Sequence, residues 1–157
     1  MTPTKAFDSF ATTLIGLRIS HVWRGYGSAI FIEIGELSPQ TRRDGSTGNP
    51  KGKVSLGVEW SWRIEDQTAI RCGSWSEEEL WEPALDTLRN ARIAGCELFG
   101  TLAEVVITTD SGVRFLSFST TEGQPRWHLV DRRDGPARWF TVRDGQLHLG
   151  DGTEPSS

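Results

Sequence analysis

The chain has 157 residues, which is the usual size of one domain and too short for two ordinary ones. Its formal charge of −4 comes from 21 acidic and 17 basic residues, so there is no net attraction for phosphate backbones and nucleic-acid binding is not expected. Hydrophobic residues make up 36% of the chain and include seven Trp and seven Phe, enough to build a core. We therefore expect a single domain over residues 1–150 and a disordered polar tail over residues 151–157.

Targeting and redox features favour a soluble, cytoplasmic protein. No basic leader precedes a long apolar run at the N-terminus, and no apolar stretch reaches membrane-spanning length, so no membrane contact is expected. Cys72 and Cys96 are the two cysteines, and they do not form a C-x-x-C pair. We interpret both thiols as reduced and buried.

The N-terminal part of the chain predicts one helix followed by strands. Apolar residues at 7, 10, 11, 14 and 15 follow the spacing of one helix face, and Gly16 ends that helix. Extended segments are expected around residues 19–22 and 29–34, on either side of a glycine-rich turn. Residues 38–53 contain polar, proline and glycine residues without a large apolar side chain, which predicts a mobile loop.

The clearest strand signal lies over residues 58–65. Strict alternation of apolar and polar residues predicts one strand with Trp60 and Trp62 on its core face and with Glu59 and Glu65 on its wet face. A returning strand is expected over residues 69–72.

A second helix is expected after residue 76. The sequence from Ser76 to Glu79 matches a capping box, but Pro83 would remove a helical hydrogen bond. Either the first turn is a separate short helix, or the main helix restarts near Glu82 with Pro83 as its first residue. The remainder predicts a meander of strands over residues 96–99, 104–109, 113–119, 127–130, 138–142 and 146–149.

The expected fold class is α+β, an antiparallel sheet packed with two helices. Shifting the sequence by 74 residues aligns several residues, among them Leu14 with Leu88 and Ile19 with Ile93, and places Gly16 on Asn90. Gly and Asn are the residue types that most often close a helix at positive φ. Two related α-β-β units explain this alignment, and so does chance; the first alternative predicts positive φ at both Gly16 and Asn90.

Catalytic and cofactor motifs are missing from the sequence. It has no G-x-S-x-G nucleophile elbow and no glycine-rich phosphate or dinucleotide loop, and its three histidines lack metal-ligand spacing, so no cofactor or metal is expected. Glu59 and Glu65, with Arg63 between them, are compatible with an acid/base pair. Ordinary cross-strand ion pairs on a solvated sheet face are the stronger interpretation of the same residues.

The tetrad Arg-Arg-Asp-Gly occurs twice, over residues 42–45 and 132–135. Two basic turns suit an acidic partner, whereas an Asp-Gly turn flanked by solvated arginines explains the same residues without one.

Aromatic residues outside the strand pattern are the strongest candidates for binding. Trp23 and Tyr26 lie at the glycine-rich turn, and Trp75 and Trp81 lie around the start of the second helix. Trp, Tyr and Arg dominate binding hot spots, so with Arg24 these side chains predict one partly exposed recognition surface. The alternative is that the tryptophans fill the gap between helix and sheet.

Residues 14–19 and 30–34, followed by Gly57-Val58-Glu59-Trp60-Ser61-Trp62-Arg63-Ile64-Glu65, resemble uncharacterised bacterial domains that pair an L-x-G-x-x-I opening with an alternating sheet. Some of those domains are similar to immunity proteins of toxin systems. The resemblance covers roughly residues 14–130, and its motifs are structural, so it transfers no functional residue. It adds modest support to the leading hypothesis, which rests on the missing catalytic motifs and the candidate aromatic anchors: a non-enzymatic domain that binds a protein partner, such as an immunity-type partner of a toxin. A small hydrolase using Glu59 or Glu65, or a carrier with an apolar cavity beneath Trp60 and Trp62, are the alternatives.

Overall fold

The computed structural model of the protein describes residues 2–150. Within them the chain forms two antiparallel sheets and two short helices, so the expected α+β class holds in a mostly β form. The expectation of two helices packed on a single sheet is wrong, because the strands divide between two sheets that share one core. The expected disordered tail over residues 151–157 lies outside the described residues.

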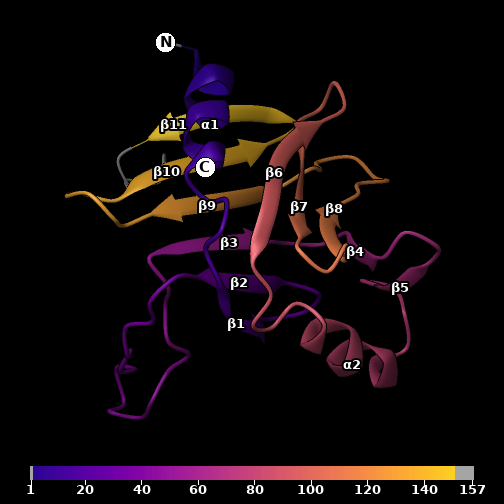
Figure 1. The fold of residues 1–157 in the computed structure, drawn as a ribbon, viewed down its shortest axis with the longest axis horizontal. Helices are drawn as coiled ribbons and strands as arrows, with labels where there is room; N and C mark the ends of the chain where they lie inside the picture. The colour runs from indigo at the N-terminus through magenta and orange to yellow at the C-terminus, as the bar shows by residue number, and fades with distance from the viewer. Residues whose placement is uncertain (1, 151–157) are drawn as a thin grey trace.

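The larger sheet has six strands in the order β1-β2-β3-β9-β10-β11. In Figure 1 its strands are stacked one above another, and the polar loop that follows β2 extends at lower left. The loop is tied by two isolated bridges, Ser38 with Lys51 and Thr41 with Thr47. The strands span β1 (Ile19–Arg24), β2 (Ile30–Ile34), β3 (Val54–Val58), β9 (Trp127–Asp131), β10 (Arg138–Arg143) and β11 (Gln146–Gly150).

The smaller sheet has five strands in the order β5-β4-β8-β7-β6, and in Figure 1 β6 and β7 run steeply beside the first sheet. They span β4 (Trp62–Glu65), β5 (Ile70–Gly73), β6 (Ile93–Phe99), β7 (Glu104–Thr109) and β8 (Arg114–Ser117). Helix α1 (Pro3–Thr12) lies against β6 and β11, and helix α2 (Trp81–Asp86) lies against β5. No helix among residues 2–150 combines the length and the apolar character needed to cross a membrane.

Both helices differ in detail from the sequence expectation. Helix α1 ends before Ile15, which is exposed and not part of the buried face. A separate 3-10 turn, η1 (Glu78–Leu80), precedes α2, which is the first of the two alternatives considered for this segment. Pro83 is the third residue of α2, where its missing N–H would have had no helical partner. Ser76 does not cap the helix, because its hydroxyl instead accepts a hydrogen bond from the Gly73 N–H.

The expected single strand over residues 58–65 is two strands in different sheets. Val58 at the end of β3 pairs with Trp127 in the larger sheet, and Trp62 at the start of β4 pairs with Ser117 in the smaller one. Between them residues 59–61 cross from one sheet to the other. Trp60 turns out of the core at φ +79° and is 55% exposed, so its assignment to the core face is wrong. Alternation alone cannot detect such a crossing, because the sequence keeps its period of two while the backbone changes direction.

The segments between each helix and the next strand pair with each other, which the sequence did not predict. The Gly16 N–H donates to the Ile93 carbonyl, and the Asn90 N–H donates to the Ile19 carbonyl, both at 2.8 Å. The 74-residue shift places Gly16 on Asn90 and Ile19 on Ile93, so it converts each of these two hydrogen bonds into the other. Gly16 has φ +88° and Asn90 has φ +69°, so the predicted positive φ is confirmed at both positions.

A second crossing connects the sheets in the reverse direction. Residues 118–126 lead from β8 in the smaller sheet to β9 in the larger one, and this crossing is longer than residues 59–61. The two crossings bond to each other, since the Glu59 N–H donates to the Arg126 carbonyl at 3.3 Å and the Phe118 N–H donates to the Ser61 carbonyl at 3.1 Å. The strands β1-β2-β3-β9-β10 of one sheet and β6-β7-β8-β4-β5 of the other thus follow one another in the same pattern.

The cap at Gly16 gives a test of this arrangement. We expect Gly16→Val to lower the free energy of unfolding by about 1–2 kcal/mol, because a side chain is strained at this positive φ even though space for a Cβ is open. Urea unfolding measures the change. Gly95→Val is the control, since Gly95 has equal space without positive φ, and an equal or larger loss there would contradict the argument from backbone strain.

Candidate functional site

Trp23 lies on the face of the larger sheet opposite the core. Its ring stacks on Phe31 with centroids 4.2 Å apart and an interplanar angle of 13°. Its indole N–H donates to Glu33 Oε2 at 2.9 Å. Trp23 is therefore half-buried and held on two sides, which leaves only part of its ring for any partner.

Trp81 belongs to the core and not to an exposed patch. It is 4% exposed, its ring meets Trp62 edge-on at 5.0 Å, and its indole N–H donates to the Ser76 carbonyl at 3.0 Å. Phe7 in α1, 74 residues earlier, packs edge-on against Trp127 in the same way. The expectation that Trp81 is partly exposed is wrong, because it occupies the helix position that anchors each half of the core.

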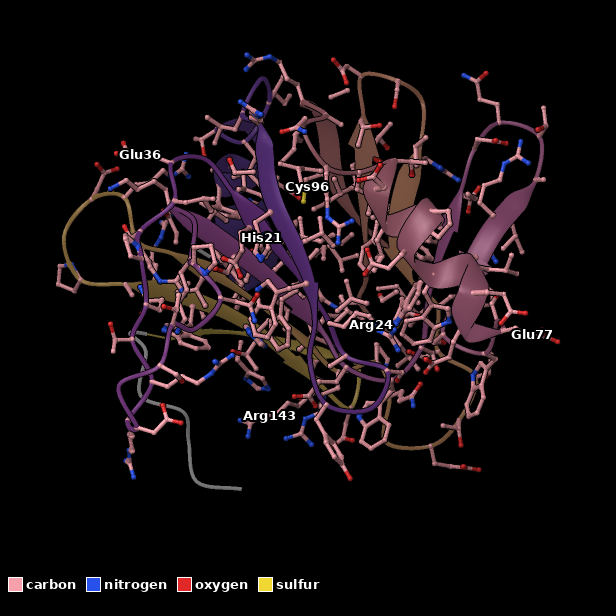
Figure 2. All side chains as sticks on the ribbon, turned by 90° about the horizontal axis from the view of Figure 1, so that it is seen from below. His21, Arg24, Glu36, Glu77, Cys96 and Arg143 are labelled. Atoms are coloured by element: carbon pink, nitrogen blue, oxygen red, sulfur yellow. The ribbon has the colours of Figure 1, made fainter. Side chains whose placement is uncertain are left out.

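Arg24 connects β1 to the segment around α2. Its guanidinium lies 4.2 Å from the centre of the Trp81 ring and pairs with Glu78 at 3.1 Å. Figure 2 shows Arg24 between the strands and the helical segment, with Glu77 pointing outward at the far end of that segment. Arg24 thus covers the outer face of a core tryptophan and also fixes the position of η1.

Tyr26 and Trp75 are as exposed as the sequence suggests. Tyr26 is fully exposed on the turn between β1 and β2, and Trp75 is 89% exposed ahead of η1. They line separate hollows on either side of the crossing over residues 59–61, so the structure does not bring them into direct contact. One hollow of about 340 Å³, the Tyr26 hollow, is lined by Tyr26, Gly27, Ser28, Ala29, Phe31, Glu59 and Trp60. The other, the Trp75 hollow, has a volume of about 240 Å³ and includes Trp75, Phe118, Ile70 and Arg63 in its lining.

Trp60 and Phe118 are the members of this surface that sequence reasoning missed. Trp60 fits the alternating pattern of a buried strand position, and Phe118 falls inside an expected strand over residues 113–119. The Ser28 hydroxyl donates to the Trp60 carbonyl at 2.7 Å, which helps to fix the turned-out backbone. The sequence signal that could have revealed them is the number of aromatic residues in these segments, which is larger than one face of a strand can bury. We call Tyr26, Trp60, Trp75 and Phe118 the crossover surface.

The other half of the molecule supplies an internal comparison. The turn over residues 100–103 between β6 and β7 and the crossing over residues 118–126 are equivalent to the elements that form the Tyr26 hollow. They also enclose a hollow, of about 520 Å³, but its lining includes Gly100, Thr101, Leu102, Thr120 and Thr121 and contains no aromatic side chain. The fold therefore does not require aromatic residues at this place.

The two candidate catalytic carboxylates do not form a pair on one strand. Glu59 lies on the crossing and makes a loose ion pair with Arg126 at 3.5 Å. Glu65 lies on β4, where Arg63 and Arg114 each donate to it at 3.0 Å. Burial raises the pKa of Glu65, but the hydrogen bonds and charges of these arginines outweigh burial and leave its pKa below the ordinary value. An ionised, doubly paired carboxylate has the character of an ion-pair network.

A buried polar cluster lies beneath Trp23. Glu33 is 1% exposed and accepts hydrogen bonds from the Trp23 indole, the Gly52 N–H and the Ser55 hydroxyl. Arg132 donates to the Ser55 hydroxyl at 2.7 Å and to the Gly52 carbonyl at 3.0 Å. Burial lowers the pKa of Arg132, and the charge of Glu33 opposes that change. Each polar atom has a partner, so the cluster fastens the polar loop to the sheet.

The repeated Arg-Arg-Asp-Gly tetrads have different surroundings. Both end in a glycine at positive φ, +87° at Gly45 and +88° at Gly135. Arg42 stays on the exposed loop and donates to the Thr47 carbonyl, whereas Arg132 joins the Glu33 cluster. Arg133 pairs with Asp131 at 2.9 Å. The second tetrad is thus engaged within the fold and does not present two solvated arginines.

The two cysteines and the possible metal ligands were the remaining candidates for chemistry among residues 2–150. Cys72 and Cys96 are free and buried, as expected. Burial raises the pKa of Cys72, and burial together with the charge of Glu97 raises the pKa of Cys96 to about 12. No three His, Cys, Asp or Glu side chains of the described part of the chain gather in a way that could hold a metal ion.

Comparisons of the chain with protein-family models, with curated proteins and with solved structures find no match. The crossover surface is therefore defined by its geometry alone.

Proposed function

We propose that this chain is a non-enzymatic, protein-binding domain of the immunity-protein kind, and that the crossover surface is where its partner binds. The observation that carries the proposal is the difference between the two equivalent halves. One half exposes Tyr26, Trp60 and Trp75, whereas the hollow at the corresponding place in the other half is lined by Gly, Thr, Leu, Ser, Glu, Gln and Pro residues. The other half exposes Phe118, which lies outside that hollow. Large aromatic side chains that the fold does not need, and that water solvates poorly, are typical of binding hot spots.

The comparison rests on a second part of the proposal, that the two halves are related α-β-β units. Support comes from the exchanged hydrogen bonds at Gly16 and Asn90, from the reciprocal sheet crossings, and from the matching contacts of Phe7 and Trp81. Divergence of one copy at a surface, while both copies keep their core contacts, is the pattern that selection for binding would leave.

Charge around the surface favours a basic partner. The exposed residues Glu77, Glu78 and Glu79 follow Trp75 after one serine, and the chain as a whole carries a net charge of −4. Complementary charge speeds association and excludes wrong partners. An aromatic surface bordered by carboxylates fits a protein whose binding face carries arginine and lysine.

The two other functions considered from the sequence have weaker support. A hydrolase would need a carboxylate with a raised pKa in a recess, whereas Glu65 is paired with two arginines and has a lowered pKa. A carrier would need an enclosed apolar cavity beneath Trp60 and Trp62, whereas Trp60 is exposed and Trp62 packs against Trp81 and Phe115.

The test separates binding from stability. We expect Tyr26→Ala to weaken the complex by on the order of 2 kcal/mol, which is about 30-fold in Kd, while leaving the unfolding midpoint nearly unchanged. The partner is first recovered from extracts of the native host with immobilised wild-type chain and with a Tyr26→Ser/Trp75→Ser variant. It is identified as a protein retained by the first and lost from the second. Its Kd for each variant is then measured by calorimetry with purified components.

The matched control is Ile15→Ser/Leu149→Ser, which removes two exposed apolar side chains outside the crossover surface. This variant should retain the partner fully. Loss of the same protein from the control, or equal retention by all three chains, would contradict the proposal. For the immunity-type role, the recovered partner should harm cells when expressed alone and should not harm them when expressed together with this chain; a harmless partner leaves protein binding but removes that role.

A further inference from the structure

We infer that the Tyr26 hollow receives an arginine side chain of the protein partner; this rests on the proposed function. The hollow combines aromatic rings from three separate segments with one carboxylate. Tyr26 comes from the turn between β1 and β2, Phe31 from β2, and Trp60 and Glu59 from the crossing. Its volume of about 340 Å³ lies at the small end of the range of roughly 300–1,000 Å³ typical of ligand sites, so a single side chain suits it better than a large ligand.

Two aromatic rings near the Tyr26 hollow are already covered by arginine side chains of the same chain. The Arg24 guanidinium lies 4.2 Å from the Trp81 ring centre, and the Arg63 guanidinium lies 4.5 Å from the Phe118 ring centre. Arg133 and Arg138 lie over Phe10, and Arg138 also lies over Phe140, so none of these four arginines covers Tyr26, Phe31 or Trp60. A planar guanidinium stacks on such rings because their faces carry negative charge density. The Tyr26 hollow is thus the place on the crossover surface where a guanidinium from outside the chain fits.

Glu59 adds a charge that selects a cation. Its carboxylate is about half exposed and its contact with Arg126, also about half exposed, is 3.5 Å long. Such a surface ion pair contributes little and leaves acceptor positions on the carboxylate available. A second guanidinium can donate to Glu59 in the two-pronged geometry that arginine favours while its plane covers an aromatic ring, and lysine lacks that planar fork.

The backbone at Trp60 supports a specific role for its ring. A bulky residue at φ +79° is rare and costs about 1–3 kcal/mol, so it persists only where other contacts hold it. The Ser28 hydroxyl bond to the Trp60 carbonyl is one such contact. The equivalent crossing over residues 118–126 makes its turn with Gly123 at positive φ and has no other residue in that conformation. That crossing has nine residues for its turn, whereas residues 59–61 cross in three, and the short crossing places the Trp60 side chain in the lining of the hollow.

The experiment uses the full chain labelled with 15N and the small probe Nα-acetyl-arginine methylamide. We expect the indole N–H signal of Trp60 to shift with the probe in a saturable way, with a Kd on the order of millimolar, as befits one side chain without the rest of a protein interface. The matching citrulline compound has the same shape without the charge and should bind at least tenfold more weakly. The lysine compound should fall between the two.

Two substitutions locate the effect. Tyr26→Ala should abolish saturation, and Glu59→Gln should raise the Kd for the arginine probe at least fivefold, whereas Glu36→Gln, an exposed carboxylate on the polar loop, should not change it. Equal binding of the citrulline compound, equal effects of the two glutamine substitutions, or the lack of saturation at tens of millimolar would each overturn the inference.

The outcome is distinguishable from failure of the proposed function. If the probe does not bind but Tyr26→Ala still weakens the protein complex, only the arginine site is rejected. If the probe binds as expected but Tyr26 and Trp75 substitutions leave every captured protein retained, the protein-binding function is rejected and the hollow remains a site for free guanidinium compounds.

Discussion

Replacing Trp62 with alanine is expected to lower the free energy of unfolding by about 3–5 kcal/mol. Trp62 is 2% exposed, stacks on Phe115 with ring centres 5.8 Å apart, and meets Trp81 edge-on at 5.0 Å. Its indole N–H also donates to the Ser28 carbonyl at 2.6 Å, so truncation leaves a cavity and an unpaired acceptor beside the crossing. Urea unfolding followed by far-UV circular dichroism measures the loss.

The matched control is Trp75→Ala, which removes the same side chain type from an 89% exposed position. Its effect on the free energy of unfolding should stay within about 0.5 kcal/mol. A loss below about 1 kcal/mol for Trp62→Ala would mean that this residue is not part of the core. Trp127 occupies the equivalent place at the start of β9 and donates to the Ala103 carbonyl, so Trp127→Ala should behave like Trp62→Ala.

Replacing Glu33 with alanine is expected to cost about 3–5 kcal/mol, the usual range when one partner of a buried charged cluster is removed. The Gly52 N–H, the Ser55 hydroxyl and the Trp23 indole would each lose an acceptor in a place that water hardly reaches. Arg132 would keep its charge without the nearby carboxylate that favours its ionised form. Denaturant unfolding measures the loss, and hydrogen exchange should rise at Gly52 because its N–H becomes free.

Glu36→Ala is the control, because Glu36 is a glutamate only three residues further along the chain but is exposed. It should change the free energy of unfolding by less than about 0.5 kcal/mol. If Glu33→Ala cost no more than Glu36→Ala, the hydrogen bonds to Glu33 would have no net effect on stability. That result would contradict the role assigned to the cluster, which is to fasten the polar loop to β2 and β3.

The sequence by itself determined local structure where a residue type strongly favours one backbone conformation. Gly16 and Asn90 adopt the positive φ that such residues take with little strain. Each lies at the end of the turn that follows a helix and not at the helix end itself, because α1 ends at Thr12 and α2 at Asp86. The turns at Gly112 and at Asp144-Gly145 also have the positive φ expected of tight hairpins. The strands over residues 104–109 and 127–131 follow from runs of β-branched and aromatic residues.

The aromatic candidates show where local patterns stop being informative. Of the five residues named from the sequence, Tyr26 and Trp75 are exposed, Trp23 and Arg24 are partly exposed but engaged within the fold, and Trp81 is in the core. Nothing near Trp81 in sequence distinguishes it from Trp75, since both precede or begin a helix. Their difference arises from Trp62 on β4, which meets the Trp81 ring edge-on and itself stacks on Phe115 of β8, whereas Trp75 is 89% exposed.

Only the tertiary structure decided how the strands divide between two sheets. Residues 58–65 keep an unbroken alternation, yet β3 finds its partner in β9, about 70 residues away in the chain, and β4 finds its partner in β8. Strand pairing at that distance depends on the whole set of competing partners and not on any local preference of the backbone. Because the crossing between the sheets turns Trp60 outward, the same long-range pairing that fixes the fold also creates the surface on which the proposed function depends.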